Sequence, residues 1–144
     1  MNAYLEMQTR HQEEMNAFPM FAAFNKEQFE EGMKKLGLRP TNMDAIQSVG
    51  YAMFIRKKDS PAFREMCHRH YKEQKDSINA DTTGEGFIRD MFVAEMCNHE
   101  YSYTYDLTDT LRALQLTAPE INASPALLHG LKLAQEAVLG EAFV

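Results

Sequence analysis

The sequence predicts a mainly α-helical fold: a single domain of residues 1–144, with six or seven helices around a central αα-hairpin and a small two-stranded antiparallel β element. Apolar residues recur at three- or four-residue spacing along most of the chain, which is typical of amphipathic helices. Helix-start signals precede several of these stretches, and Ser60-Pro61 is the strongest of them. Only residues 20–24 and 51–56 have the short apolar or β-branched composition that is typical of strands.

The N-terminal third shows two helices with recognisable ends. Residues 3–17 are expected to form an amphipathic helix that Pro19 ends, because proline cannot continue a helical hydrogen-bond ladder. Asn25 and Gln28 have the spacing of a capping box and predict the start of a second helix. Gly37 is well placed to end that helix, since glycine readily adopts the left-handed conformation required there.

The predicted β element consists of residues 20–24 and 51–56, paired antiparallel. A short helix through Met43 and Ile46 is expected between them. Gly50 then interrupts the helical pattern before the second strand. The helical segment between the two strands is long enough to bring them side by side.

The predicted core is an αα-hairpin formed by residues 61–80 and 86–99 and joined by a turn at residues 81–86. Phe92→Ala should therefore be strongly destabilising, since it would leave a cavity. Six side chains are expected to pack between the two helices: Phe63, Cys67, Tyr71, Phe87, Met91 and Phe92. Capping or proline signals predict further helices that begin at Asp106 or Thr108, at Thr117 and at Ser124-Pro125.

The overall composition excludes several classes of protein. Hydrophobic residues make up 44% of the chain and charged residues 25%, as in ordinary globular domains. No apolar run approaches the roughly 18 residues of a membrane span, and the first twenty residues lack a signal-peptide pattern. We therefore expect a cytoplasmic protein that makes no membrane contact. Cys67 and Cys97 are expected to be free thiols in that compartment.

Negative charge is concentrated in residues 76–109. This stretch holds eight acidic residues and one base, Arg89, a net charge of −7, whereas the whole chain carries −6. Such a segment indicates a cation site or a surface for a basic partner. The only run of three consecutive basic residues is Arg56-Lys57-Lys58, so direct binding of DNA or RNA is disfavoured.

The turn at residues 81–86 begins like a calcium-binding EF-hand loop. Asp81, Thr83 and Glu85 fall at loop positions 1, 3 and 5, and Gly86 at position 6. Position 12, which requires a bidentate glutamate, is occupied by Phe92. The sequence therefore predicts a polar turn between helices, with a weak cation site as the alternative.

Two further hypotheses concern metal and catalysis. Cys67 with His70, and Glu95 with His99, have the i,i+3 and i,i+4 spacings that could face each other across two antiparallel helices. A small metal-dependent hydrolase is the corresponding alternative. The alternative to a metal site is that these histidines pack in the fold and form hydrogen bonds with neighbouring carboxylates. We predict neither a metal nor a cofactor, and no catalytic residue.

Tyrosines alternate at positions 101, 103 and 105. If this segment is extended, Tyr101, Tyr103 and Tyr105 project to one side. Rigid aromatic rings with polar tips suit protein interfaces. The alternative is that one or two of these rings fill the core beneath the acidic helix.

Three stretches carry a resemblance to a known group of proteins: Phe18-Pro-Met-Phe21, residues 28–38, and Asp81-Thr-Thr-Gly-Glu-Gly-Phe-Ile through Asn98-His-Glu-Tyr. Over most of residues 1–130 the chain resembles small uncharacterised proteins of bacterial conjugative elements and prophages. The resemblance assigns no chemistry to any residue. It implies that the gene lies among the accessory genes of such elements. These genes often encode inhibitors of host defence, including anti-CRISPR proteins.

The sequence as a whole favours a non-enzymatic inhibitor that binds a host defence protein, such as a CRISPR nuclease, through an acidic surface. The alternatives are a cation-binding helix-loop-helix module and the metal-dependent hydrolase. No sequence signal sets the oligomeric state. The candidate partner-binding residues are Asp81, Glu85, Asp90, Glu100, Tyr101, Tyr103 and Tyr105.

Overall fold

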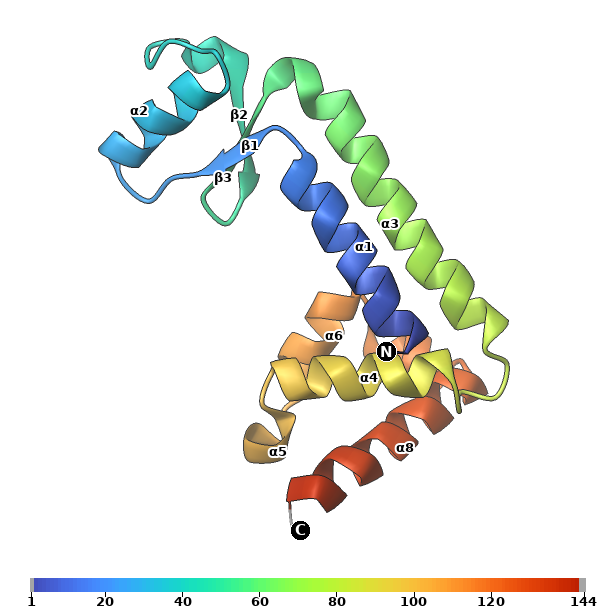
Figure 1. The fold of residues 1–144 in the computed structure, drawn as a ribbon. Coiled ribbons are helices and arrows are strands. Elements are labelled where there is room, and N and C mark those ends of the chain that lie inside the picture. Colours follow the sequence, from blue (N-terminus) through green and yellow to red (C-terminus); the bar gives the residue numbers. More distant parts are fainter. Residues whose placement is uncertain (1, 143–144) are drawn as a thin grey trace. The chain divides into compact units, whose positions relative to one another are not determined.

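The computed structural model describes residues 2–142, and in this part of the chain it contains eight α-helices, three strands and two 3-10 turns (Figure 1). The prediction of a mainly helical protein with a small β element is confirmed. The helices are α1 (Ala3–Ala17), α2 (Lys26–Lys35), α3 (Ser60–Ala80), α4 (Phe87–Asn98), α5 (Tyr101–Thr104), α6 (Thr108–Leu114), α7 (Ala118–Asn122) and α8 (Pro125–Ala142).

Contacts divide the chain into two units. We name them the helical unit (Met1–Arg10 with Glu73–Val144) and the sheet unit (His11–Lys72). Helices α1 and α3 each contribute residues to both. That residues 1–144 form one domain stays a prediction. None of the helices in the described part of the chain combines the length and apolar character that crossing a lipid bilayer requires.

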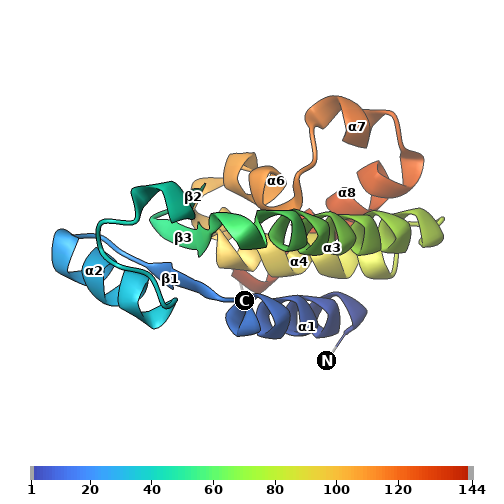
Figure 2. The same ribbon diagram turned by 90° about the horizontal axis from the view of Figure 1, so that it is seen from above.

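The helical unit is built around α4. The side chains of Ile88, Met91, Phe92 and Met96 are fully buried. A helix that is apolar around much of its surface belongs in a core rather than on a surface. Helix α7 lies in the connection from α6 to α8 (Figure 2). Side chains of α1, α6, α7 and α8 complete the cluster, among them Tyr4, Met7, Leu114, Ile121, Leu127, Leu131 and Val138.

The main partner of α4 is α8, with further contacts to α5 and α6. The predicted hairpin core of residues 61–80 and 86–99 is therefore corrected. Phe63 and Cys67 belong to the sheet unit and are only half-buried, whereas Phe92 lies in the core as predicted. The apolar periodicity identified α4 as buried, but a helix with several buried sides does not reveal which neighbour covers it.

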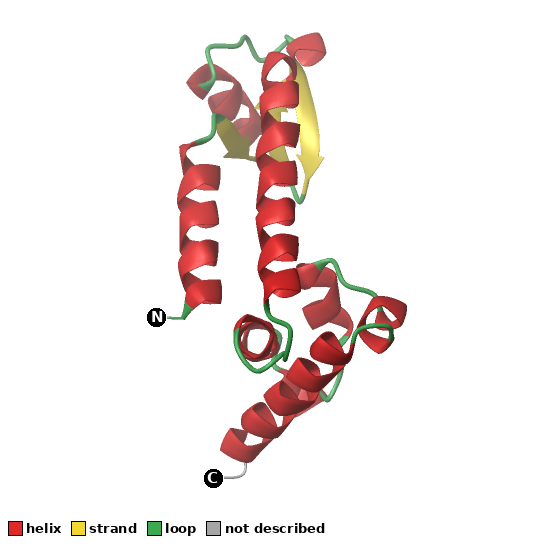
Figure 3. Ribbon diagram, turned by 90° about the vertical axis from the view of Figure 1, so that its right-hand side faces the viewer, coloured by secondary structure: helices red, strands yellow, loops and turns green. Residues whose placement is uncertain are grey.

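The sheet unit contains a three-stranded antiparallel sheet, drawn in yellow in Figure 3. Its strands are β1 (Met20–Ala22), β2 (Ile46–Gly50) and β3 (Met53–Arg56), in the order β1-β3-β2. Met20 pairs with Ile55 and Ala22 with Met53, so the predicted antiparallel pairing is confirmed.

The third strand is a correction to the predicted two-stranded element. Residues 43–45 form one 3-10 turn, and the chain continues as β2 where the sequence predicted a short helix through Met43 and Ile46. Ile46 is buried beneath the sheet, against α2. Pairing with β3 therefore overrides the weak helical signal of this short segment.

Helix α2 begins and ends as its sequence predicts. The Asn25 side chain accepts the backbone N–H of Gln28 (2.8 Å), and the Gln28 side chain accepts the N–H of Phe24 (2.7 Å). Gly37 follows the helix with a φ of 76°, and the N–H of Leu38 donates to the carbonyl of Met33 (2.8 Å). These bonds pair groups that helix ends otherwise leave unsatisfied.

An aromatic cluster joins α2 to the sheet. The Phe21 ring stacks on Phe54 (centroids 5.3 Å apart) and meets the edge of Phe29 (5.7 Å). Phe21 also lies against Gly32 so closely that a Cβ atom on Gly32 would come within 2.1 Å of the ring. The absence of a side chain at residue 32 is therefore what allows α2 to lie on the sheet.

Gly32→Ala should destabilise the protein, although alanine is the better helix former. The added methyl group must displace the Phe21 ring, and such overpacking costs about 1–3 kcal/mol. Urea unfolding followed by circular dichroism measures the change. Gly140→Ala, on a helix position with open space around it, is the matched control and should not destabilise. An equal effect of both substitutions would contradict the packing argument.

A histidine pair joins α1 and α3 within the sheet unit. The rings of His11 and His70 stack with centroids 3.9 Å apart. The Nε2 atom of His70 is buried without a hydrogen-bond partner and lies 3.6 Å from the Glu14 carboxylate, which also pairs with Arg69. Burial and the neighbouring His11 lower the pKa of His70, against the opposing effect of Glu14.

The free energy of unfolding should therefore fall as the pH drops from 7 to 5. The unfolded chain binds a proton near the ordinary histidine pKa of about 6.5, whereas the folded state resists protonation of His70, so this stability is present above that pH and lost below it. His70→Gln should flatten the dependence. His129→Gln, at an exposed position, is the control. Identical slopes for the wild type and His70→Gln would disprove the assignment.

Candidate protein-binding site

The loop before α4 is organised by one carboxylate. Both oxygens of Asp81 accept backbone N–H groups: Gly84 at 3.0 Å, Gly86 at 3.1 Å and Ile88 at 3.0 Å. Partial burial acts to raise the pKa of Asp81, but these bonds outweigh it and hold the pKa below its ordinary value. Asp81 therefore caps the N-terminal end of α4.

Two glycines let this loop lie directly against α8. Gly84 has a φ of 81°, and a Cβ atom there would come within 2.1 Å of the carbonyl oxygen of Ala126. A Cβ atom on Gly130 would come within 2.4 Å of the Ile88 side chain and 2.7 Å of the Gly84 carbonyl. The close approach of these two backbones sets where α4 begins relative to α8.

These contacts show what the acidic side chains of residues 81–86 do in the folded protein. Asp81 was expected to be solvated and available to a partner or a cation, but its oxygens are engaged with the backbone. Phe92, at the place of the missing calcium ligand, is fully buried. Glu85 is exposed and lies 3.3 Å from His129. The loop is thus a polar turn between helices, as the first of the two sequence hypotheses stated.

Asp81→Ala should lower the free energy of unfolding by about 1–2 kcal/mol, the usual effect of removing a capping side chain. Glu85→Ala, four residues away, removes only a surface pair and should change stability by less than about 0.5 kcal/mol. Chemical unfolding of both variants measures this. Millimolar calcium should leave the wild-type midpoint unchanged. A calcium-raised midpoint that Asp81→Ala abolishes would instead restore the cation hypothesis.

The described part of the structure contains no arrangement of side chains that matches the metal hypothesis. Within the described residues, no group of three or more His, Cys, Asp or Glu side chains could hold a metal ion. Cys67 and His70 lie in the sheet unit, whereas Glu95 and His99 lie in the helical unit. Burial also raises the pKa of the Cys67 thiol, which disfavours the thiolate that a metal or a nucleophilic reaction needs.

Glu95 has a structural partner instead. The hydroxyl group of Tyr4 donates to its carboxylate at 2.8 Å, and both side chains are buried. His99 lies 3.5 Å from the same carboxylate. Burial and the bond to Glu95 raise the pKa of Tyr4 well above its ordinary value. This contact ties α1 to α4 and explains a polar residue on the inner side of α4.

The three tyrosines separate into one buried and two exposed rings. Tyr101 lies in the core with 6% of its surface exposed, and its hydroxyl oxygen accepts a hydrogen bond from Gln135 (3.0 Å). Tyr103 is 84% exposed and Tyr105 57% exposed. The segment is not extended, because residues 101–104 form a helical turn in which positions i and i+2 face nearly opposite directions, and the alternative that one of the rings fills the core is confirmed for Tyr101. Tyr101 is thereby removed from the predicted binding residues.

The remaining acidic residues do not form one patch. Glu85 precedes α4, and Asp90 lies in its first turn, half-buried and 3.5 Å from Arg89. Glu100 follows the other end of α4. The helix has 12 residues and is about 18 Å long. The predicted surface therefore divides into two places, of which the second also carries exposed aromatic rings.

We call this second place the tyrosine turn: Glu100, Tyr103 and Tyr105. Its two ends, Glu100 (φ 56°) and Tyr105 (φ 55°), have the left-handed backbone that glycine or asparagine usually supplies. The ring of Tyr105 meets the edge of buried Tyr101 at 6.3 Å, which anchors it. The sequence does not reveal this strain, because neither glutamate nor tyrosine signals a left-handed position.

A model of one protein family covers nearly the whole chain. The model, described as a family of unknown function (DUF7659), matches residues 3–137. The chain belongs to this family. No curated protein and no solved structure matches it significantly. Membership in DUF7659 assigns no role to any residue of the tyrosine turn.

Proposed function

We propose that this DUF7659 protein is a non-enzymatic binding protein whose tyrosine turn docks on a basic surface of a partner protein. The observation that carries the proposal is the exposure of Tyr103 and Tyr105 on a turn anchored through buried Tyr101. Exposed tyrosines on a fixed backbone lose little conformational entropy on binding and are enriched among residues that dominate interface energies.

Backbone strain at the same turn supports the proposal. A left-handed conformation costs a residue with a side chain about 1–2 kcal/mol, and this turn contains two such positions, Glu100 and Tyr105. Strain of this kind accumulates at binding sites, where stability is not the only requirement. Glycine or asparagine would suit the backbone better, but would not supply the carboxylate and the ring.

The charge around the turn favours a basic partner. Glu100, Asp106 and Asp109 are all exposed, and Arg112, 3.5 Å from Asp109, is the only base between residues 90 and 131. Carboxylates near aromatic contacts accelerate the approach to a basic surface and select against acidic ones. This rate effect weakens as salt screens the charges.

For the partner, we propose a host defence nuclease such as a CRISPR nuclease, with the protein acting as its inhibitor in the cytoplasm. The support is the resemblance to proteins of conjugative elements and prophages, together with the match between an acidic turn and the basic groove that a nuclease offers to nucleic acid. Carboxylates in such a groove would compete with phosphates.

Tyr103→Ser and Tyr105→Asn should each weaken inhibition roughly 30-fold, the effect of losing a dominant interface contact of about 2 kcal/mol. Neither should destabilise the fold, because Tyr103 is solvent-exposed and asparagine tolerates the backbone of residue 105. Cleavage assays with a panel of CRISPR nucleases measure inhibition. Glu85→Lys, beyond the other end of α4, is the control and should inhibit like the wild type.

Two results would overturn the proposal. One is a wild-type protein that inhibits no nuclease in the panel and captures no protein partner. The other is an activity that His99→Ala abolishes while both tyrosine variants retain it, which would favour an enzyme. A further variant, Glu100→Lys, tests the contribution of charge. Reversing the charge of residue 100 should slow association with the partner protein, and the effect should be largest at low salt.

A further inference from the structure

The tip of the β2–β3 hairpin exposes an aromatic ring on a strained turn. The two connecting residues, Tyr51 and Ala52, have φ values of 51° and 62° and follow Gly50 at 92°. Two-residue hairpin turns of this kind favour Asn-Gly, which adopts these angles without strain. Tyr51 is 93% exposed. Neither burial nor turn geometry therefore explains a tyrosine at this position.

A second exposed ring lies at the same end of the sheet. The N–H of Ala23 donates to the carbonyl of Ala52 (2.9 Å), which ties the residues before Phe24 to the hairpin tip. Phe24 is 80% exposed, and its N–H is held by Gln28. A groove of about 610 Å³ within the sheet unit follows α2 from Phe24 to Lys35, and its lining also includes Met15, Met20 and Met53.

The other end of the sheet unit is basic. Residues 34–59 hold six basic and two acidic residues, a net charge of +4 in a chain of −6. Arg56 pairs with Asp59 at 2.7 Å. The other five bases form no ion pair within the part of the chain that the structure describes; we name them the basic end: Lys34, Lys35, Arg39, Lys57 and Lys58.

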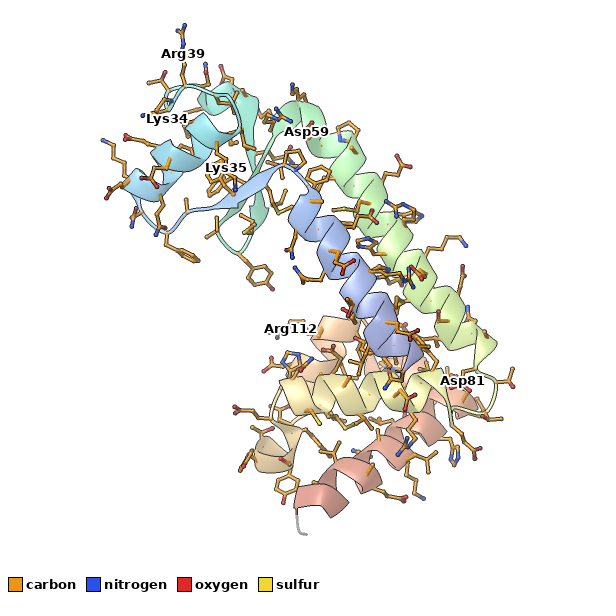
Figure 4. All side chains as sticks on the ribbon, viewed as in Figure 1. Lys34, Lys35, Arg39, Asp59, Asp81 and Arg112 are labelled. Atoms are coloured by element: carbon orange, nitrogen blue, oxygen red, sulfur yellow. The ribbon has the colours of Figure 1, made fainter. Side chains whose placement is uncertain are left out.

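The fold gathers these five residues from separate segments. Arg56 reaches the carbonyl of Leu36 (3.5 Å), so the end of β3 lies at the end of α2. The N–H of Arg39 donates to Asn42, next to the 3-10 turn Met43–Ala45, and this turn contacts the turn Lys57–Asp59. Figure 4 labels Lys34, Lys35 and Arg39 in this part of the sheet unit.

We propose that the sheet unit binds single-stranded nucleic acid, with Tyr51 and Phe24 stacking on bases and the basic end contacting phosphates. Strand β3, of four residues, separates the two ends by about 13 Å. A strand of a few nucleotides covers that span, and single-strand binding proteins combine these same two features. A duplex would hide the base faces that the rings require.

This inference goes beyond the proposed function, since it concerns another unit and another class of ligand. The sequence disfavoured nucleic acid because it showed only one basic run, Arg56-Lys57-Lys58. The fold adds Lys34, Lys35 and Arg39 to that run and places two aromatic rings at the opposite end of the same sheet.

Fluorescence anisotropy of the full chain with a labelled oligothymidylate of about 12 nucleotides tests the proposal. Tyr51→Asn should weaken binding roughly tenfold while raising the thermal midpoint, because asparagine relieves the strained turn. Phe24→Ser should weaken binding similarly. Lys57→Glu combined with Lys58→Glu should weaken it further and reduce the steepness of its salt dependence.

The controls are Tyr103→Ser and Lys132→Glu, which make the same kinds of change in the helical unit and should bind as the wild type does. Wild-type affinity in Tyr51→Asn would overturn the proposal, and so would a loss in Lys132→Glu as large as that in the double variant of Lys57→Glu and Lys58→Glu. Binding to duplex alone, or no binding, would also overturn it. If the nucleic-acid proposal fails, the proposed binding of a protein partner is not affected. That binding depends on the tyrosine turn, which Tyr103→Ser tests separately.

Discussion

The start of α4 is the constraint on which the helical unit depends. One short carboxylate, Asp81, accepts the backbone N–H groups of Gly84 and Gly86 in the loop and that of Ile88 in the first turn of α4, which a helix start would otherwise leave unpaired. The loop that it organises then approaches the backbone of α8 at Gly84 and Gly130, where no side chain fits. With its first turn fixed against α8, α4 buries Phe92 and its other apolar residues on several sides. The Asp81 carboxylate, which has the sequence position of a calcium ligand, therefore stabilises the fold of the helical unit.

A comparable constraint operates in the sheet unit. Its strands are short, and a sheet of three such strands needs a packed face for stability. The Phe21 ring supplies that face by stacking on Phe54, and it reaches α2 only because Gly32 has no side chain. In both units, then, glycine marks the place where one backbone or ring must come close to another.

Strain and exposure coincide at two turns. Tyr51 and Tyr105 have left-handed backbone conformations and exposed rings, and Tyr103 is exposed beside the second turn. A chain selected for stability alone would place glycine or asparagine at such positions. The two proposals rest on this coincidence, one in each unit, and the surrounding charge is acidic in one case and basic in the other. The opposite charges are the reason for proposing different ligands.

The sequence by itself determined the features that arise within a few residues of chain. Asn25 and Gly37 predicted the ends of α2, and the strand composition predicted the pairing of β1 with β3, because capping and β-propensity act locally. Tertiary structure decided which elements pack together and which side chains they bury. It made α8 the partner of α4, added β2 as a third strand, and buried Tyr101 while leaving Tyr103 exposed. Burial depends on distant segments, and a helical turn in place of an extended segment reverses which side chains face inward. Asp81 shows the same limit, since its ligand-like spacing was visible in the sequence but its backbone partners were not.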